Sequence, residues 1–183
     1  MNKPVNFLSA ISLASASLFA VPAAAQETGV LVTSSVQALD ASTVKTMLNR
    51  AHIKNTYDPV AKADRREGAK ALVIAFGVRI KGFGAAGITA EAELVRTSVL
   101  LAEAKKRGIE VIGVHIGGMD RREGLSKQFV QLVASKADAL AVWKNGAGDG
   151  FFTKTAADRG VPLVLIDLPM KVGDAIAEQL PKS

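Results

Sequence analysis

Short apolar runs alternate with amphipathic segments along most of this chain, and this alternation limits the possible folds more than any other feature. The runs are rich in Val, Ile, Leu and Ala, which is typical of strands buried on both faces of a parallel sheet. The segments between them place apolar residues at helical spacing. The expected strands cover residues 30–33, 54–57, 71–76, 109–116, 139–143 and 161–166.

Helices are expected between these strands, and the clearest begins after Thr89. Thr89 is a typical N-cap residue, and Gly108 is typical of the position after a helix end. Acidic residues lie in the first turn and basic residues in the last, which suits the helix dipole. The other expected helices follow Asp40 as N-cap, cover 151–159 and 172–180, or carry the inner face Leu125, Phe129, Leu132 and Val133.

Alternating strands and helices joined by short loops predict a mostly parallel sheet with right-handed crossovers. The strands are too few for an eightfold barrel. We therefore expect an α/β three-layer sandwich of flavodoxin-like or Rossmann-like type. The segment near Tyr57 is polar and is followed by Pro59, so it suits a sheet edge and favours the strand order 2-1-3-4-5-6.

The first 25 residues have the pattern of a secretory signal peptide. A basic start at Lys3 precedes an apolar stretch over 7–21, and the small residues 23–25 form a cleavage pattern before Gln26. The expected organisation is a signal peptide over 1–25 and a single α/β domain over 26–183. We expect a periplasmic protein, with full secretion as the alternative.

Composition excludes several classes of function. The chain has no Cys, which removes thiol catalysis and Cys-ligated metal sites. Its formal net charge is +6, but the basic and acidic residues are interspersed along the chain, which has one Trp and one Tyr. No nucleic-acid partner is therefore expected. No other stretch reaches the roughly 20 apolar residues of a membrane span. We therefore expect a soluble mature chain.

Glycine and polar residues gather in the loops that follow the strands. Ligands of open α/β sheets bind at this carboxyl edge, where glycine lets the backbone approach and helix N-termini favour anions. The candidate ligand-binding residues are Lys81, Gly82, Gly84, Gly87, His115, Gly117, Gly118, Arg121, Lys144, Asn145 and Asp149. The structural alternative is that such loops need glycine for tight turns alone.

Residues 82–87 read Gly-x-Gly-x-x-Gly, but the pattern departs from a dinucleotide-binding fingerprint. Residues 79–81 intervene between the expected strand and Gly82, and no acidic residue ends the next strand. No cofactor is therefore expected.

Phe151 and Phe152 are adjacent, so one is expected in the core and the other on the wall of a pocket.

Reactive side chains gather around His115. A hydrolase or transferase centred on His115, with Asp120 or Asp149, is one alternative reading. The structural alternative is a half-buried His115 with a backbone partner, Asp149 as a helix N-cap, and solvated arginines at 121 and 122. No His and Asp pair has helical ligand spacing, so no metal site is expected.

Four motifs carry a resemblance to a known family. They are residues 57–59, 81–87, 114–118 and 148–153, which read YDP, KGFGAAG, VHIGG and GDGFFT. With them, the chain resembles an uncharacterised bacterial family of small secreted α/β proteins, a domain of unknown function. The resemblance implies an exported α/β protein and supplies no activity. Residues 137–167 are also similar in texture to one lobe of a periplasmic solute-binding protein.

These observations favour a binding or accessory role in the periplasm for a small, anionic molecule, and an enzyme is the less favoured reading. A protein-interaction module, with a periplasmic protein partner, is the second alternative and predicts an exposed apolar patch. The enzyme centred on His115 is the third.

Overall fold

The computed structural model describes residues 29–36, 39–64, 68–77 and 89–181. They form one parallel six-stranded sheet in the order β2-β1-β3-β4-β5-β6. The strands are β1 (Val30–Ser34), β2 (Asn55–Tyr57), β3 (Ala71–Ala75), β4 (Glu110–His115), β5 (Ala139–Trp143) and β6 (Leu163–Ile166). This confirms the α/β class and the strand order predicted from the sequence.

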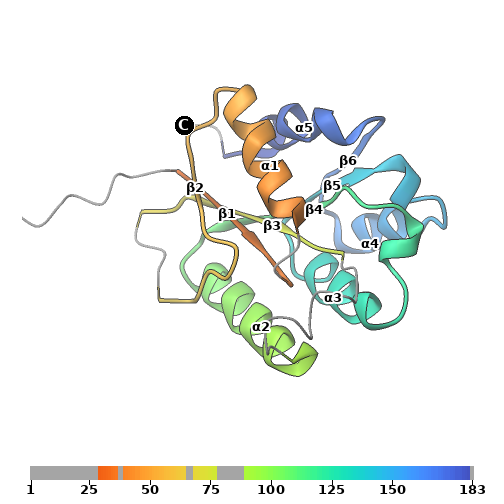
Figure 1. Cartoon of the computed structure of the whole chain (residues 1–183), viewed down its shortest axis with the longest axis horizontal. Coiled ribbons are helices and arrows are strands. Elements are labelled where there is room, and N and C mark those ends of the chain that lie inside the picture. The colour runs from red at the N-terminus through yellow and green to blue at the C-terminus, as the bar shows by residue number, and fades with distance from the viewer. Residues whose placement is uncertain (1–28, 37–38, 65–67, 78–88, 182–183) are drawn as a thin grey trace, which may run out of the picture.

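Helices cover both faces of the sheet. They are α1 (Leu39–Arg50), α2 (Ala90–Lys106), α3 (Leu125–Ala134), α4 (Phe151–Arg159) and α5 (Val172–Gln179). Short 3-10 turns precede α3, α4 and α5: η3 (Met119–Arg121), η4 (Lys144–Gly146) and η5 (Pro169–Lys171). Figure 1 shows α1 and α5 on one side of the sheet and α2 and α3 on the other.

Alternating residues of the strands pack into two separate hydrophobic cores, one on each face of the sheet. In β3 and just after it, Leu72, Ile74 and Phe76 pack with α2, α3 and α4. Val73 and Ala75 face the opposite way and pack with α1 and α5. Both faces of the central strands are thus covered, which explains why their sequences are continuously apolar.

Helix ends follow the chemistry of the sequence. The Oγ1 atom of Thr89 accepts a hydrogen bond of 3.2 Å from the Ala92 N–H, which confirms Thr89 as the N-cap of α2. Gly160 ends α4 in the left-handed conformation, with φ of 63°.

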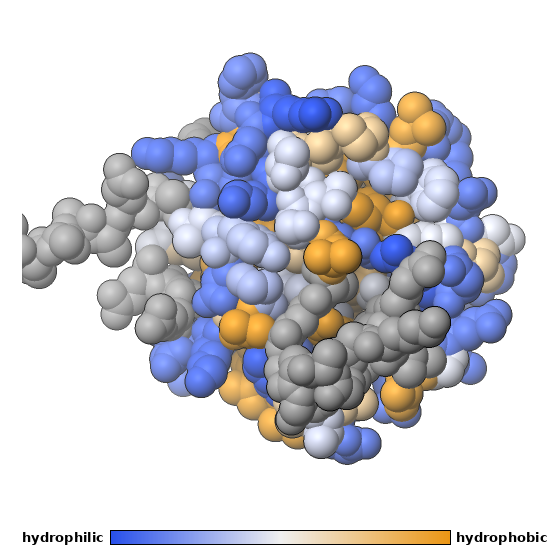
Figure 2. Space-filling model, in the orientation of Figure 1, coloured by the Kyte–Doolittle hydropathy of each residue, from blue (hydrophilic) through white to orange (hydrophobic). Residues whose placement is uncertain are grey.

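Most of the face in Figure 2 is polar or charged, with scattered apolar spots. No helix among the described residues is both long and apolar enough to cross a membrane.

Two helix predictions were wrong in detail. Asp40 lies in the first turn of α1 and is not its N-cap. Leu125 is 38% exposed, because it begins α3 at the carboxyl edge, where the sheet no longer covers it. The buried face of α3 is instead built from Ser126, Phe129, Val130, Val133 and Ala134.

Candidate functional site

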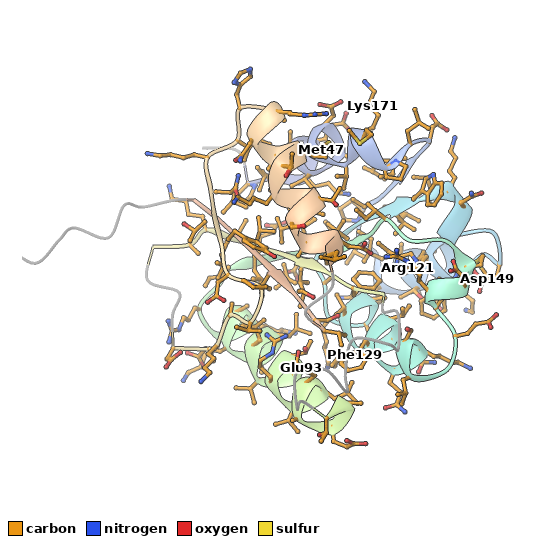
Figure 3. All side chains as sticks on the ribbon, viewed as in Figure 1. Met47, Glu93, Arg121, Phe129, Asp149 and Lys171 are labelled. Atoms are coloured by element: carbon orange, nitrogen blue, oxygen red, sulfur yellow. The ribbon has the colours of Figure 1, made fainter. Side chains whose placement is uncertain are left out.

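The loops after β4 and β5 meet at the carboxyl edge of the sheet. Parallel strands bring these ends together, and η3 contacts η4 directly. Figure 3 labels Arg121 of η3 and Asp149, which lies between η4 and α4. Four candidate ligand residues, Lys81, Gly82, Gly84 and Gly87, lie outside the described residues.

His115 ends β4 and is completely buried. Its Nδ1 atom lies 2.9 Å from the carbonyl oxygen of Phe76. A carbonyl only accepts hydrogen bonds, so Nδ1 carries the proton of the neutral ring and Nε2 carries the lone pair. Within the described part of the chain, Nε2 is buried and has no hydrogen-bond partner. The ring is stacked on Phe76, with centroids 5.5 Å apart, and its centroid is 5.6 Å from that of Phe152.

Glycines make room for this imidazole. A Cβ atom on Gly77 would lie 2.6 Å from His115 Nδ1, and one on Gly146 would lie 2.7 Å from His115 Cδ2. Gly77 also has φ of +107°, which L side chains rarely adopt. At Gly117 an added Cβ would lie 2.5 Å from the Cδ atom of Arg121. These glycines therefore allow close packing within the loops.

The surroundings of His115 favour its neutral form. Burial lowers the pKa of His115, and the nearby charge of Arg122 acts in the same direction. The backbone of Phe76 and Gly118 and the carboxylate of Asp40 oppose this effect. The net result is a pKa below the usual value of histidine.

Arg121 and Asp40 form an ion pair in which a single guanidinium nitrogen reaches both carboxylate oxygens. The Nη1 atom of Arg121 donates to both carboxylate oxygens of Asp40, at 2.7 and 2.8 Å. The two residues are 81 positions apart in the chain. Arg121 was expected to grip a ligand, and in this structure its charge is instead balanced by the buried Asp40.

Arg122 is the centre of a second cluster. Its Nη1 and Nη2 atoms donate to the two oxygens of Asp149 at 2.6 and 2.9 Å, and Nη1 also donates to the Gly146 carbonyl at 2.7 Å. The guanidinium carbon lies 5.0 Å from the ring centroid of Phe151 and 4.7 Å from that of Phe152. The Arg122 side chain is only 8% exposed. This central role of Arg122 was not predicted from the sequence.

Asp149 accepts hydrogen bonds both from Arg122 and from the start of α4. The hydrogen bonds from Arg122 hold the pKa of Asp149 below its usual range. Its Oδ1 atom also accepts from the Phe151 N–H at 3.1 Å, although the N-cap residue itself is Gly150. Among the described residues, His115 makes no hydrogen bond with Asp120 or Asp149. The alternative of a His–Asp catalytic pair therefore gains no support from this geometry.

The remaining candidates lie on the outer side of η4. The Nζ atom of Lys144 lies 2.5 Å from Asp167 Oδ1, and both side chains are more than half exposed. Asn145 is exposed beside it. No group of three or more His, Cys, Asp or Glu placed to hold a metal occurs in the part of the chain that the structure describes.

A groove of about 620 Å³ opens between the start of α3 and the start of α4. We call it the Arg122 groove; its lining includes Met119, Arg122, Glu123, Lys127, Asp149 and Phe151. Phe152 is fully buried in the core, whereas half-buried Phe151 forms part of the groove wall, which confirms the prediction for this pair. An adjoining groove of about 510 Å³ shares Gln131 and Phe151 with it.

The Arg122 groove offers both charged and backbone groups. No hydrogen bond or ion pair engages the side chains of Glu123 or Lys127 within residues 89–181. Gly124, the N-cap residue of α3, supplies no side-chain cap, and the first turn holds no acidic residue. Glu123 and Lys127 were not among the predicted site residues, although both closely follow η3, which holds Arg121.

Comparisons with known proteins give a family and nothing more. The sequence profile of a family described as a domain of unknown function (DUF6305) matches residues 27–180. No curated protein and no solved structure matches the chain. The resemblance noted in the sequence is thereby confirmed at the level of an uncharacterised family.

Proposed function

The chain belongs to the DUF6305 family, a domain of unknown function, and we propose that it binds a small molecule with an anionic group in the Arg122 groove. The observation that carries this proposal is the groove itself, which lies at the carboxyl edge of the sheet. Its volume of about 620 Å³ falls within the roughly 300–1,000 Å³ of ordinary ligand sites.

The lining suits an anionic group attached to an apolar body. Lys127 is exposed and has no partner among the described residues, so its charge is available. The start of α3 adds the positive end of the helix dipole, although the N–H groups of Ser126 and Lys127 already donate to the carbonyls of Glu123 and Gly124. Met119 and Phe151 supply apolar contact area in the same groove.

We also propose that this binding takes place in the periplasm, after removal of residues 1–25. The proposal rests on the signal pattern of the N-terminus. In a Gram-negative host, the periplasmic fraction should contain a protein whose intact mass is that of a chain beginning at Gln26. Recovery of the uncleaved chain from the cytoplasm alone would contradict this localisation.

Native mass spectrometry of the mature protein, compared with a denatured sample, tests the binding proposal. We expect a small adduct that disappears on denaturation and is lost from the Lys127→Glu variant. Lys136→Glu is the matched control, because Lys136 is an exposed lysine just beyond the end of α3 and does not line the groove. A bare mass, together with no NMR shifts at the groove on titration with acetate or inorganic phosphate, would refute the proposal.

A second candidate, an interaction with a periplasmic protein, is favoured by one feature of the sheet edge. Leu165, Leu168 and Met170 are 39%, 59% and 53% exposed, and β6 is the last strand of the sheet. An unpaired edge strand can add a strand from a partner. If this role holds, Leu168→Asp should abolish capture of a partner and leave the adduct unchanged.

A further inference from the structure

The charges of the Arg122 groove are balanced. Arg122 already bonds both carboxylate oxygens of Asp149, so this pair has no net charge to offer. Of the remaining charged lining groups, Glu123 is acidic and Lys127 is basic, and neither has a partner among the described residues. A ligand that carries an anionic group alone would leave Glu123 without a counter-charge, whereas a zwitterion would satisfy both side chains.

The uncharged part of the lining has the chemistry of a peptide site. Phe151 and Met119 provide apolar surface in the Arg122 groove. The adjoining groove carries the amides of Gln128 and Gln131 and the hydroxyl of Thr155. Amides and hydroxyls both donate and accept hydrogen bonds, as the N–H and C=O groups of a peptide backbone require.

We propose that the Arg122 groove takes a short peptide with free termini, whose carboxylate faces Lys127 and whose ammonium group faces Glu123. This inference rests on the proposed function, because it names the class of molecule that the same groove binds. Glu123, Lys127 and Gln131 all line this groove, so the Gln131 amide can pair with the peptide backbone between the two charged termini.

Isothermal titration calorimetry and two-dimensional NMR test the proposal on the mature protein. The probes are the tripeptide Ala-Phe-Ala with free termini, its N-acetyl form, its C-terminal amide, and acetate. We expect the free tripeptide to bind with shifts confined to η3, α3 and α4. Each blocked form should bind about tenfold more weakly or worse, because a charge-assisted hydrogen bond is lost.

Two variants assign the termini. Glu123→Gln should weaken binding of the free tripeptide but leave the affinity of the N-acetyl form unchanged. Lys127→Gln should weaken the free tripeptide but leave the affinity of the amide unchanged. Lys136→Gln and Glu178→Gln are controls, since both residues are exposed and lie outside the groove lining.

The possible results separate the two proposals. If the N-acetyl form binds as tightly as the free tripeptide, or if only acetate shifts the groove, the peptide inference is wrong and the binding function stands. If no probe shifts residues of the groove, both are wrong. Shifts by the tripeptide together with the paired loss in the variants would establish the peptide class.

Discussion

His115 combines full burial with a ring nitrogen that no group in the described ranges satisfies. Its other nitrogen is fixed by the Phe76 carbonyl, and the ring packs against the aromatic side chains of Phe76 and Phe152. The imidazole is therefore held as a neutral, packed side chain. Protonation would place a positive charge in this buried position beside Arg122.

The folded protein should lose stability in mild acid because of His115. Its pKa is lowered in the folded state, so below about pH 6.5 the unfolded chain binds a proton that the folded chain resists. The stability that neutral His115 contributes is present above pH 6.5 and falls as the pH drops toward the folded pKa. The slope should reach at most about 1.4 kcal/mol per pH unit. Urea unfolding between pH 7.5 and 5 measures it.

The variant His115→Asn checks the assignment, because an amide can still donate to the Phe76 carbonyl but does not titrate. Its pH slope in this range should be smaller than that of the natural protein. His52→Asn is the control and should retain the slope, since His52 is exposed. If the His115 ring instead titrates near pH 6.5 by NMR in the folded protein, the explanation is wrong.

At the scale of elements, η4 must lie directly against the end of β4. The Cα atom of Gly146 faces the His115 ring so closely that a methyl group there would meet the ring and the Gly117 carbonyl. Gly148, two residues later in the same loop, has nothing within 4 Å of the same position. The two glycines thus differ in packing although the sequence around them is similar.

Replacing Gly146 by Ala should destabilise the protein by about 1–3 kcal/mol, the usual cost of forcing extra atoms into a packed site. Gly148→Ala should change the free energy of unfolding by less than about 1 kcal/mol, because the added methyl meets open space. Urea denaturation of both variants provides the comparison. Equal losses in the two variants would show that the contact with His115 does not govern this loop.

The sequence predicts the elements well because their signals are local. The continuous apolar run of β3 and the capping oxygen of Thr89 are local features of the sequence. The site was predicted less well because its pairs join distant positions: Arg122 and Asp149 are 27 residues apart, and Arg121 and Asp40 are 81 apart. No helical or strand periodicity links such residues, so the partner of each arginine appears only when the loops are assembled.

At the scale of the whole molecule, the two cores share one sheet. The cluster that includes Phe152 and the cluster that includes Ile176 lie on opposite faces of the same strands. Loss of the helices on one face would expose the apolar side chains of the strands on that face, and the helices on the other face pack against the same strands. The layers are therefore expected to support one another and to unfold together.

Trp143, the single tryptophan of the chain, offers a direct test of this cooperativity. It packs against the cluster that contains Ile176, and its Nε1 atom donates to the Asp167 carbonyl at 3.0 Å, so its fluorescence follows the β5–β6 edge. The fluorescence transition in urea should coincide with the transition by far-ultraviolet circular dichroism, which follows the helices of both layers. A fluorescence transition at lower urea would mean that the β5–β6 edge opens before the rest. In that case, the exposed strand edge would be an independently mobile part of the fold.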